Sequence, residues 1–484
     1  MRIRLPLLFL APLLLSMGVW SDVPEAGWLD VDSLGNPAAA GARLPRLTQT
    51  PDGGVIMSWV EPRADGHVLK YAVRKGDGWE PQHEVTEGAG WFVNWADFPS
   101  VTAISPEFWL AHWMVKRPGG KAYEYDISMA FSNDGGSRWR HLQSPHRDAV
   151  AAEHGFATIF PSGNSAGVIW LDGRYSVKSD GHAGHHEQSG HFNLMYTQIL
   201  PDGGMGVEQV LDGNTCSCCW TSAAVTPEGP VVAWRGRTDD EIRDHRISIM
   251  RNGIWSQPAP LGAEGWEIAG CPVNGPSLAS NGKQVVAAWF TAQGDKPRVR
   301  VAFSRDGGRH FDVPVEIDQQ APLGRIGLVW RGEDAAIVSW MTARNPGTGY
   351  SSIALRVVRN DGQLGPVMRL ADISAGRDTG VPQMAAVSQG LLLAWTGQAP
   401  GYGIKTALLS WEKLVMKDTR TMSSRLQYAY SGMQQVFRYE LQDRFSAAAT
   451  GQVKTMLQSG VMMRAPTHKE SKANPPSTGV SQQH

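Results

Sequence analysis

Charge and long apolar runs are scarce in this sequence. Only 19% of the 484 residues are charged and the formal net charge is −1, so no strong field attracts nucleic acid or an anionic membrane. Beyond the N-terminal segment, no stretch is long and apolar enough to cross a bilayer. The chain has only four cysteines but 54 glycines and 30 prolines, a composition that favours many turns over long helices.

The N-terminus, MRIRLPLLFLAPLLLSMGVWSD, is the exception. Arg2 and Arg4 precede an apolar core from Leu5 to Leu15, and small residues follow, which predicts a cleaved export signal over residues 1–21. An uncleaved anchor is the alternative, although the core is shorter than a bilayer requires. No cysteine follows the core, which excludes a lipid-anchored form. We therefore expect a periplasmic or secreted protein without a stable membrane span after cleavage.

Apolar, β-rich stretches that end in tryptophan recur along the chain. The residues before each tryptophan are typical of a buried strand. The tryptophans are 51 to 64 residues apart: Trp59, Trp113, Trp170, Trp234, Trp289, Trp340 and Trp395. So regular a period indicates a repeat architecture.

A turn sequence with Gly beside Asp or Asn occurs once in each of the first six units. The turns are at Asp77, Asp134, Asp202, Asn252, Asp306 and Asp361, and each predicts a hairpin. Four strands per unit predict an all-β fold, a β-propeller over residues 25–412, with seven blades favoured and six as the alternative. The stretch GWLDVDS from Gly27 would supply the strand missing from the last unit. Residues 413–484 are predicted to form a helix and a disordered tail.

Two of these turns share a longer phrase, FSNDGGSRW from Phe131 and FSRDGGRHF from Phe303. The phrase resembles the Asp-box of the sialidase (neuraminidase) and BNR-repeat superfamily. Its matching positions are Ser132, Asp134, Gly136 and Trp139, and then Ser304, Asp306, Gly308 and Phe311. The resemblance implies a sialidase-like propeller in which this box is a structural turn away from the active site.

Arginines recur after the tryptophan strands, on the face that carries the loops between the second and third strands and those joining one blade to the next. Four lie four residues after a tryptophan: Arg63, Arg117, Arg174 and Arg344. Arg237 lies three residues after Trp234, and Arg325 and Arg377 lie on loops that join blades. Guanidinium groups around one mouth would bind a carboxylate or sulfate. Alternatively, each arginine pairs with a neighbouring acid.

The resemblance to sialidases adds candidate catalytic residues. ARLPRL is similar to the family's motif for the arginine that binds the sialate carboxylate, which implies that role for Arg43. GYSSIAL is similar to the segment with the nucleophilic tyrosine, which implies that role for Tyr350, and Asp65 stands where the family places its general acid. Together with Arg237 and Arg325, these residues imply an exo-sialidase-like hydrolase acting on an acidic carbohydrate. A non-catalytic binding platform is the alternative, because a propeller fold alone does not establish catalysis.

The four cysteines fall on the same loop face, in CSCCW (Cys216, Cys218, Cys219) and AGCPVNG (Cys271). These segments open neighbouring blades, and an exported chain favours disulfides, so we predict a bridge from Cys218 or Cys219 to Cys271 and no cofactor. The alternative is a thiolate site for copper or zinc. It would draw on the histidine-rich segment SDGHAGHHEQSGH, with His182, His185 and His186.

Overall fold

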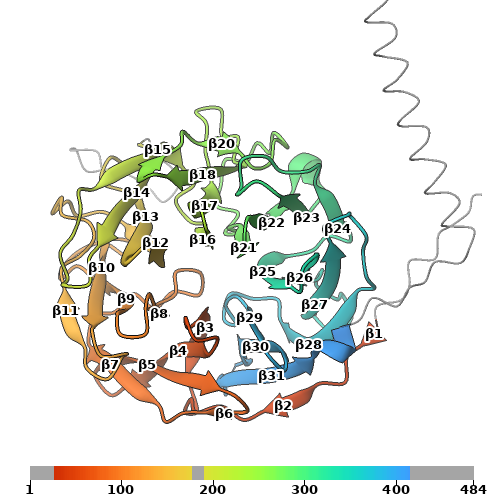
Figure 1. The fold of residues 1–484 in the computed structure, drawn as a ribbon, viewed down its shortest axis with the longest axis horizontal. Coiled ribbons are helices and arrows are strands. Elements are labelled where there is room, and N and C mark those ends of the chain that lie inside the picture. Colours follow the sequence, from red (N-terminus) through yellow and green to blue (C-terminus); the bar gives the residue numbers. More distant parts are fainter. Residues whose placement is uncertain (1–26, 177–189, 400, 415–484) are drawn as a thin grey trace, which may run out of the picture. The chain divides into compact units, whose positions relative to one another are not determined.

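The fold, in a computed structural model that describes residues 27–176, 190–399 and 401–414, is a seven-bladed β-propeller (Figure 1). Seven sheets of four or five strands surround a central axis, with the first strand of each blade innermost. In the described part of the chain, helix is confined to two short 3-10 segments, and no helix has the length and apolarity needed to cross a membrane. The predicted propeller and its favoured blade number are confirmed.

The first three blades follow one another along the chain, each with antiparallel strands. Blade one contains β3 (Arg43–Gln49), β4 (Val55–Arg63), β5 (Gly66–Lys75), β6 (Gly78–Trp79) and β7 (His83–Gly88). Blade two contains β8 (Ser100–Ala103), β9 (Trp109–Lys116), β10 (Tyr125–Ser132) and β11 (Arg140–Leu142). Blade three contains β12 (His154–Ser162), β13 (Ser165–Asp172), β14 (Phe192–Ile199) and β15 (Gln209–Thr215).

The next three blades repeat this order. Blade four contains β16 (Ser222–Thr226), β17 (Gly229–Arg235), β18 (His245–Arg251), β19 (Ile254–Trp255) and β20 (Ala259–Pro260). Blade five contains β21 (Ser277–Asn281), β22 (Gln284–Thr291), the 3-10 segment η1 (Gln293–Asp295), β23 (Arg298–Ser304) and β24 (Val315–Asp318). Blade six contains β25 (Gly324–Arg331), β26 (Ala335–Met341), β27 (Tyr350–Arg359) and β28 (Met368–Ser374).

The seventh blade closes the ring with strands from both ends of the described chain. It contains β29 (Gln383–Val387), β30 (Gly390–Thr396), β31 (Ile404–Ser410) and the early strand β2 (Asp32–Leu34), followed by η2 (Trp411–Leu414). β2 pairs antiparallel with β31, as the sequence predicted for the stretch from Gly27. A shorter strand, β1 (Gly27–Trp28), pairs in parallel with β28 of blade six.

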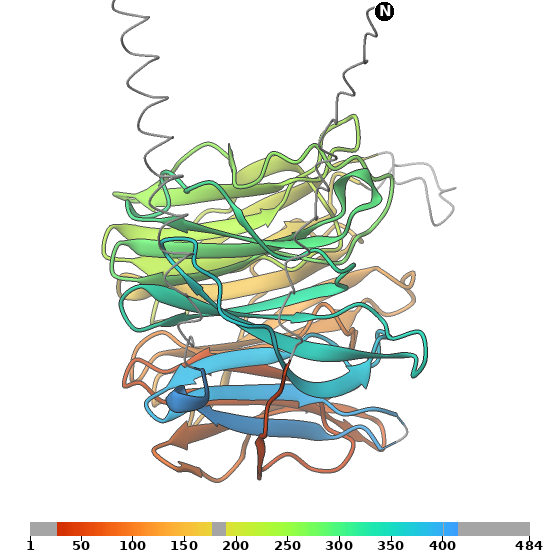
Figure 2. The same ribbon diagram turned by 90° about the vertical axis from the view of Figure 1, so that its right-hand side faces the viewer.

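Tryptophans form the core between neighbouring blades, where the sheets stack face to face (Figure 2). All seven predicted tryptophans lie on the second strand of a blade, and five are fully buried: Trp59, Trp170, Trp234, Trp289 and Trp340. Each of these five donates its indole N–H to a carboxylate, on Glu61, Asp172, Asp212, Glu264 and Asp318 respectively. The bond satisfies a polar atom that would be costly to bury unpaired.

The two long Asp turns close their hairpins by bonds within five residues of sequence. Ser132 Oγ accepts the N–H of Gly136 at 2.9 Å, and Asp134 Oδ1 accepts the N–H of Arg138 at 2.9 Å. Gly136 has φ +86°, and its carbonyl accepts the hydroxyl of Tyr71 from blade one at 2.7 Å. Ser304 Oγ accepts the N–H of Gly308 at 3.0 Å in the second copy. These turns therefore also tie each blade to the one before it.

Candidate functional site

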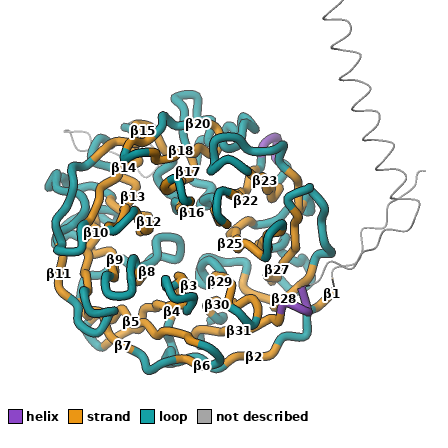
Figure 3. The backbone as a smooth tube through the Cα atoms, in the orientation of Figure 1, coloured by secondary structure: helices purple, strands orange, loops and turns teal. Residues whose placement is uncertain are grey.

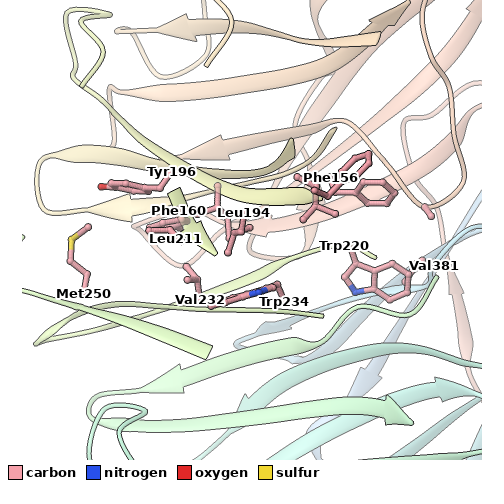
Figure 4. Close-up of a cluster of buried hydrophobic side chains, with 14 residues drawn as sticks. Phe156, Phe160, Leu194, Tyr196, Leu211, Trp220, Val232, Trp234, Met250 and Val381 are labelled. Atoms are coloured by element: carbon pink, nitrogen blue, oxygen red, sulfur yellow. The ribbon is translucent and has the colours of Figure 1, made fainter. Parts of the chain in front are cut away.

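The connections between blades run along one side of the propeller (Figure 3). Figure 4 shows part of the apolar cluster between blades three and four, which Trp220 and Val381 join from two such connections and Phe156 joins from β12. Trp95 and Cys218, which are partly buried, pack against it. We call this side of the propeller the loop face, and it carries all the groups described below.

Two carboxyl groups and a phenol form the most unusual polar contact of the loop face. Tyr125, the first residue of β10, lies with its hydroxyl 2.8 Å from Asp97 Oδ2 and 3.1 Å from Glu153 Oε1. Asp97 lies on the β7–β8 loop and also accepts the N–H of Phe156 at 2.9 Å. Glu153 precedes β12 and forms a parallel bridge with Tyr125. We call Asp97, Tyr125 and Glu153 the acid trio.

The acid trio holds a proton near neutral pH. Burial raises the pKa of Asp97 to about 7 and that of Glu153 to about 8, and burial also raises the pKa of Tyr125. One phenol proton cannot bond two ionised carboxylates at once, so a proton retained on one carboxyl relieves the repulsion between them. Asp97 is only 1% exposed, whereas Glu153 is partly exposed. Solvent therefore reaches Glu153 more readily than Asp97.

Two arginines lie over the aromatic ring of Trp95, which precedes Asp97 by two residues in the chain. The guanidinium carbons of Arg325 and Arg377 lie 4.7 Å and 5.9 Å from the Trp95 ring centre, within cation–π range. Arg325 also donates to the carbonyls of Gly380 at 2.9 Å and Gly376 at 2.6 Å. Burial lowers its pKa to about 10. Within the described residues neither arginine forms an ion pair with a carboxylate; Arg325 is 6% exposed, whereas Arg377 is exposed.

Arg325 lies over Trp95, which is two residues from Asp97 of the trio. The guanidinium of Arg43 instead stacks on Tyr402 at 3.8 Å, and Asp65 is exposed in the turn between β4 and β5. Arg237 pairs with Glu241. Tyr350 begins β27, as the sequence indicated, and is 42% exposed. The contacts of the described residues join neither Arg325 nor these four to the trio directly, and the catalytic roles of all five stay predictions.

The arginines that follow the tryptophan strands are mostly committed to partners. Arg63 pairs with Glu84, Arg117 with Asp126, and Arg174 with Asp148, Asp172 and Glu208, while Arg344 donates to the carbonyl of Gly349. These pairs support the alternative interpretation of the arginine pattern for this set. An ion pair held in a fold leaves little charge for a ligand.

A small cavity beneath the loop face contains an arginine that the sequence argument passed over. It has a volume of about 30 Å³, and its lining includes Arg46, Ser100 and His112. Arg46 donates to Gln383 Oε1 at 3.0 Å, and burial lowers its pKa to about 10. Burial, reinforced by the charge of Arg46, lowers the pKa of His112 to about 3. A space of this size holds water rather than a sugar.

The four cysteines are free thiols, so the predicted disulfide is not formed in the structure. Cys216 Sγ lies 3.6 Å from the Sγ atoms of both Cys218 and Cys219, and contact with Cys218 lowers the pKa of Cys271 to about 7. Hydrogen bonds from Cys218 and Cys219 hold the pKa of Cys216 well below its ordinary value. Sulfur atoms from two neighbouring blades therefore meet in one group, as the equivalence of their loops suggested. The histidines predicted as further metal ligands, His182, His185 and His186, lie outside the described residues.

A second cluster of titratable groups is buried between blades two and three. His154 is 0% exposed, with Nδ1 at 3.3 Å from Asp126 and Nε2 at 3.3 Å from Asp148. The ring of His146 stacks on it at 3.9 Å, and burial lowers the pKa of His146 to about 4. Arg117 and Arg174 pair with the acids of this cluster. Its charges are matched internally, which is typical of a structural network.

The sequence did not predict the acid trio because its members come from three segments that are far apart in the chain. Tyr125 and Glu153 are 28 residues apart, as are Asp97 and Tyr125. The usable signal is positional, since Tyr125 begins a strand and Glu153 directly precedes one at the loop face. Binding and catalytic groups are often placed at such strand ends.

No protein-family model and no curated protein matches the sequence. Among solved structures, the chain is similar to a protein of unknown function from Dyadobacter fermentans, at 15% identity and a TM-score of 0.45, over 78% of this chain and 97% of that one. It is also similar to an α-L-arabinanase from Penicillium chrysogenum, at 12% identity and a TM-score of 0.43, over 79% and 100% of the two chains. An intramolecular trans-sialidase from Ruminococcus gnavus is similar at 10% identity and a TM-score of 0.44, over 80% and 98%. The similar structures thus include both arabinanases and sialidases, and the likeness is one of fold.

Proposed function

We propose that this protein is an exported propeller that binds, and hydrolyses, a carboxylate-bearing glycan at its loop face. The observation that carries the proposal is the acid trio, which keeps a proton near neutral pH beside an aromatic ring that two unpaired arginines cover. A carboxyl group that stays protonated at working pH is what glycoside hydrolysis needs as a general acid.

Glu153 is the proton donor in this proposal. Its pKa of about 8 keeps it protonated at pH 7, and its partial exposure lets it reach a glycosidic oxygen. Asp97, buried and bonded to the backbone of Phe156, fixes the hydroxyl of Tyr125, which in turn positions Glu153. In the hydrolysis, the Glu153 proton goes to the leaving oxygen and the glycosidic bond breaks. Water supplies the hydroxyl group of the new hemiacetal or hemiketal, and the other proton of that water returns to the Glu153 carboxylate. Glu153 thus takes the general-acid role that the sialidase resemblance implied for Asp65.

The ligand's carboxylate would lie against Arg325 and Arg377. Their guanidinium groups face Trp95, whose ring holds them in place by cation–π contact. A charge-assisted hydrogen bond to a carboxylate contributes roughly 1.5–3 kcal/mol, so such contacts decide between acidic and neutral sugars. This choice of ligand keeps the role predicted for Arg325 and Arg377 in the arginine pattern and adds Trp95 as the residue that they contact.

The test is a panel of glycans that differ in charge. Purified protein is incubated with sialyllactose, uronic acid oligosaccharides and neutral arabino-oligosaccharides, and both binding and release of reducing sugar are measured. Glu153→Gln should retain binding and lose roughly 10²–10⁴-fold in hydrolysis. The matched control is Glu84→Gln, which removes an exposed acid of blade one and should leave both unchanged. Failure of every acidic glycan to bind, or hydrolysis that survives Glu153→Gln, would refute the proposal.

Export is part of the proposal and has its own test. The signal predicted over residues 1–21 should be absent from protein recovered from the periplasm or the medium. N-terminal sequencing of that protein should begin near residue 19 or 22, after cleavage near residue 18 or 21. An intact N-terminus at Met1 on protein that remains in the cytoplasm would contradict it.

A further inference from the structure

Three cysteine sulfurs converge within a single four-residue segment of the loop face. Cys216, Cys218 and Cys219 lie between β15 and β16, and their Sγ atoms all lie within 4.8 Å of one another. Cys271, on the connection from β20 to β21, is in contact with Cys218. Cys216 and Cys219 are buried, Cys218 is partly buried and Cys271 is exposed. The group is thus open to solvent on one side.

The spacing of the sulfurs suits a shared metal ion. Four thiolates bound to one ion at about 2.3 Å are separated by about 3.8 Å along each edge of the tetrahedron. The distance from Cys216 to each of its two neighbours is 3.6 Å, whereas a disulfide would require about 2.05 Å. A distance of 3.6 Å is also typical of two neutral thiols in van der Waals contact, so the spacing alone does not distinguish thiols from metal-bound thiolates.

Buried positive charge beside the sulfurs favours thiolates. Arg235 is 1% exposed, and its guanidinium donates only to the carbonyls of Arg243, Asn274 and Phe290. No carboxylate of the described residues forms an ion pair with it. Its charge and that of Arg243, whose Nη1 lies 3.4 Å from Cys216 Sγ, act on the cysteines. A buried cation is stable only beside compensating negative charge, which thiolates supply and a disulfide does not.

The neighbouring blade completes the surroundings of the sulfurs. The N–H of Asn274 donates to Cys219 Sγ at 3.4 Å, while the carbonyl of the same residue accepts from Arg235. A Cβ on Gly275 would lie 2.0 Å from the carbonyl oxygen of Trp220, so the two loops pack too closely for any larger residue there. Donors that orient thiolates and a rigid loop contact are features of metal sites.

We propose that Cys216, Cys218 and Cys219 form a thiolate site for one soft d10 cation, Cu(I) with these three sulfurs or Zn(II) with Cys271 as the fourth. Three sulfurs from one short segment, with the fourth in contact with Cys218 alone, match the three-coordinate preference of Cu(I) better than the tetrahedral preference of Zn(II). The two arginines offset the negative charge of the ligand set. The site is independent of the proposed glycan hydrolysis and does not require it.

The experiment uses the full chain, purified, reduced and freed of metal without oxygen. Cu(I) and Zn(II) are titrated separately against chromogenic chelators, and X-ray absorption counts the sulfur ligands. We expect one equivalent of Cu(I) with three sulfur ligands. Cys218→Ser, at a partly exposed position, should lower the affinity by more than the roughly 10–100-fold typical of losing a residue that only hydrogen-bonds to a ligand. Melting temperatures verify that the variant folds.

Cys271→Ser is the matched variant that separates the two ions. It should leave Cu(I) binding within a fewfold of the parent and weaken Zn(II) strongly, because only Zn(II) needs four ligands. Tight Zn(II) binding with four sulfurs would also support the thiolate site and would identify its ion as zinc. Binding through nitrogen ligands alone, as His182, His185 and His186 would give, overturns the proposal. So does native protein with two disulfides that binds neither ion after reduction.

Discussion

The two faces of this propeller are built in different ways. On the face with the Asp turns, the bonds that Ser132 and Asp134 accept from the backbone close within five residues of sequence. On the loop face, the bonds of the acid trio join residues far apart in sequence, as between Tyr125 and Glu153. The first face repeats the same bonds in two blades, whereas the second places acids beside blade two and sulfurs beside blade four. Repetition therefore marks the scaffold, and departure from repetition marks the candidate sites.

The largest loss of stability is expected from a substitution at Gly136, on the face with the Asp turns. A Cβ there would lie 2.5 Å from the hydroxyl of Tyr71 and 2.9 Å from the Trp109 ring, at φ +86°. Gly136→Ala should therefore lower the free energy of unfolding by about 3 kcal/mol, as measured by urea denaturation. Gly53→Ala is the control, because it has φ +84° but no atom within 4 Å of its Cβ, and should cost only about 1 kcal/mol. Equal losses in the two variants would show that the contact with blade one is unimportant.

A smaller loss is expected at Ser132, which is 1% exposed. Its Oγ accepts the N–H of Gly136 and donates to Asp134, so Ser132→Ala leaves a buried N–H without its acceptor. We expect a loss of about 1–2 kcal/mol in thermal or urea unfolding. Ser137→Ala, which removes an exposed bond to the Asp134 carbonyl, should change stability by less than about 0.5 kcal/mol. If both variants are neutral, the side-chain bonds do not maintain the turn.

The carboxyl groups of the loop face should make the free energy of unfolding depend on pH. The raised pKa values of Asp97 and Glu153 mean that the folded state binds their protons more tightly than the unfolded state. Their contribution to stability is thus complete below the ordinary carboxyl pKa near 4 and is lost as the pH rises through about 7 and about 8. Compared with Glu153→Gln, the parent protein should therefore lose stability between pH 5 and 9.

Comparison with Glu153→Gln is needed because buried histidines act in the opposite direction. The lowered pKa values of His112 and His146 make stability rise with pH up to about 6.5. Subtracting the two unfolding curves isolates Glu153, whose pKa also responds to Asp97, Cys271 and Cys216. A difference that does not vary with pH would mean that Glu153 titrates normally.

The smallest effect on stability, with a clear effect on binding, is expected at Arg377. This exposed residue contacts Trp95 by its charge alone, so Arg377→Ala should change the free energy of unfolding by less than about 0.5 kcal/mol. Loss of Arg377 should weaken the binding of an acidic glycan by roughly tenfold and leave the binding of a neutral glycan unchanged, as measured by calorimetry. Arg344→Ala, another exposed arginine of the loop face, is the control and should leave both unchanged. Equal weakening of neutral and acidic sugars would remove the proposed carboxylate contact.

The sequence predicts the scaffold of the propeller better than it predicts the contacts of the loop face. Tryptophan strands and Asp turns are local signals, and they predicted the propeller, its seven blades and the closing strand from Gly27 correctly. The carboxylate partner of each tryptophan was not predictable in the same way, because it lies two residues away at Glu61 but on another strand at Asp318.

The candidate sites were predicted only where blade equivalence carried the argument. Equivalent loop positions correctly placed Cys271 near Cys218, whereas sequence alone could not determine whether the sulfurs would bond to each other. The arginine pattern placed Arg325 on the loop face, where the structure shows it over Trp95. The same pattern also included Arg174, which is bound to three carboxylates. Pairing depends on which acids the fold brings near, and that information is spread over several blades.

The pairing of β2 with β31 makes the first and last parts of the propeller neighbours in one sheet. Six blades are each drawn mainly from one stretch of chain, but the seventh is a seam held by hydrogen bonds and packing between distant segments. Strand pairing and blade packing therefore continue all the way around the ring, and only the covalent chain is interrupted, at the seventh blade. New chain ends introduced between two other blades, with the old ends joined, would move this seam around the ring and leave the number of blades unchanged.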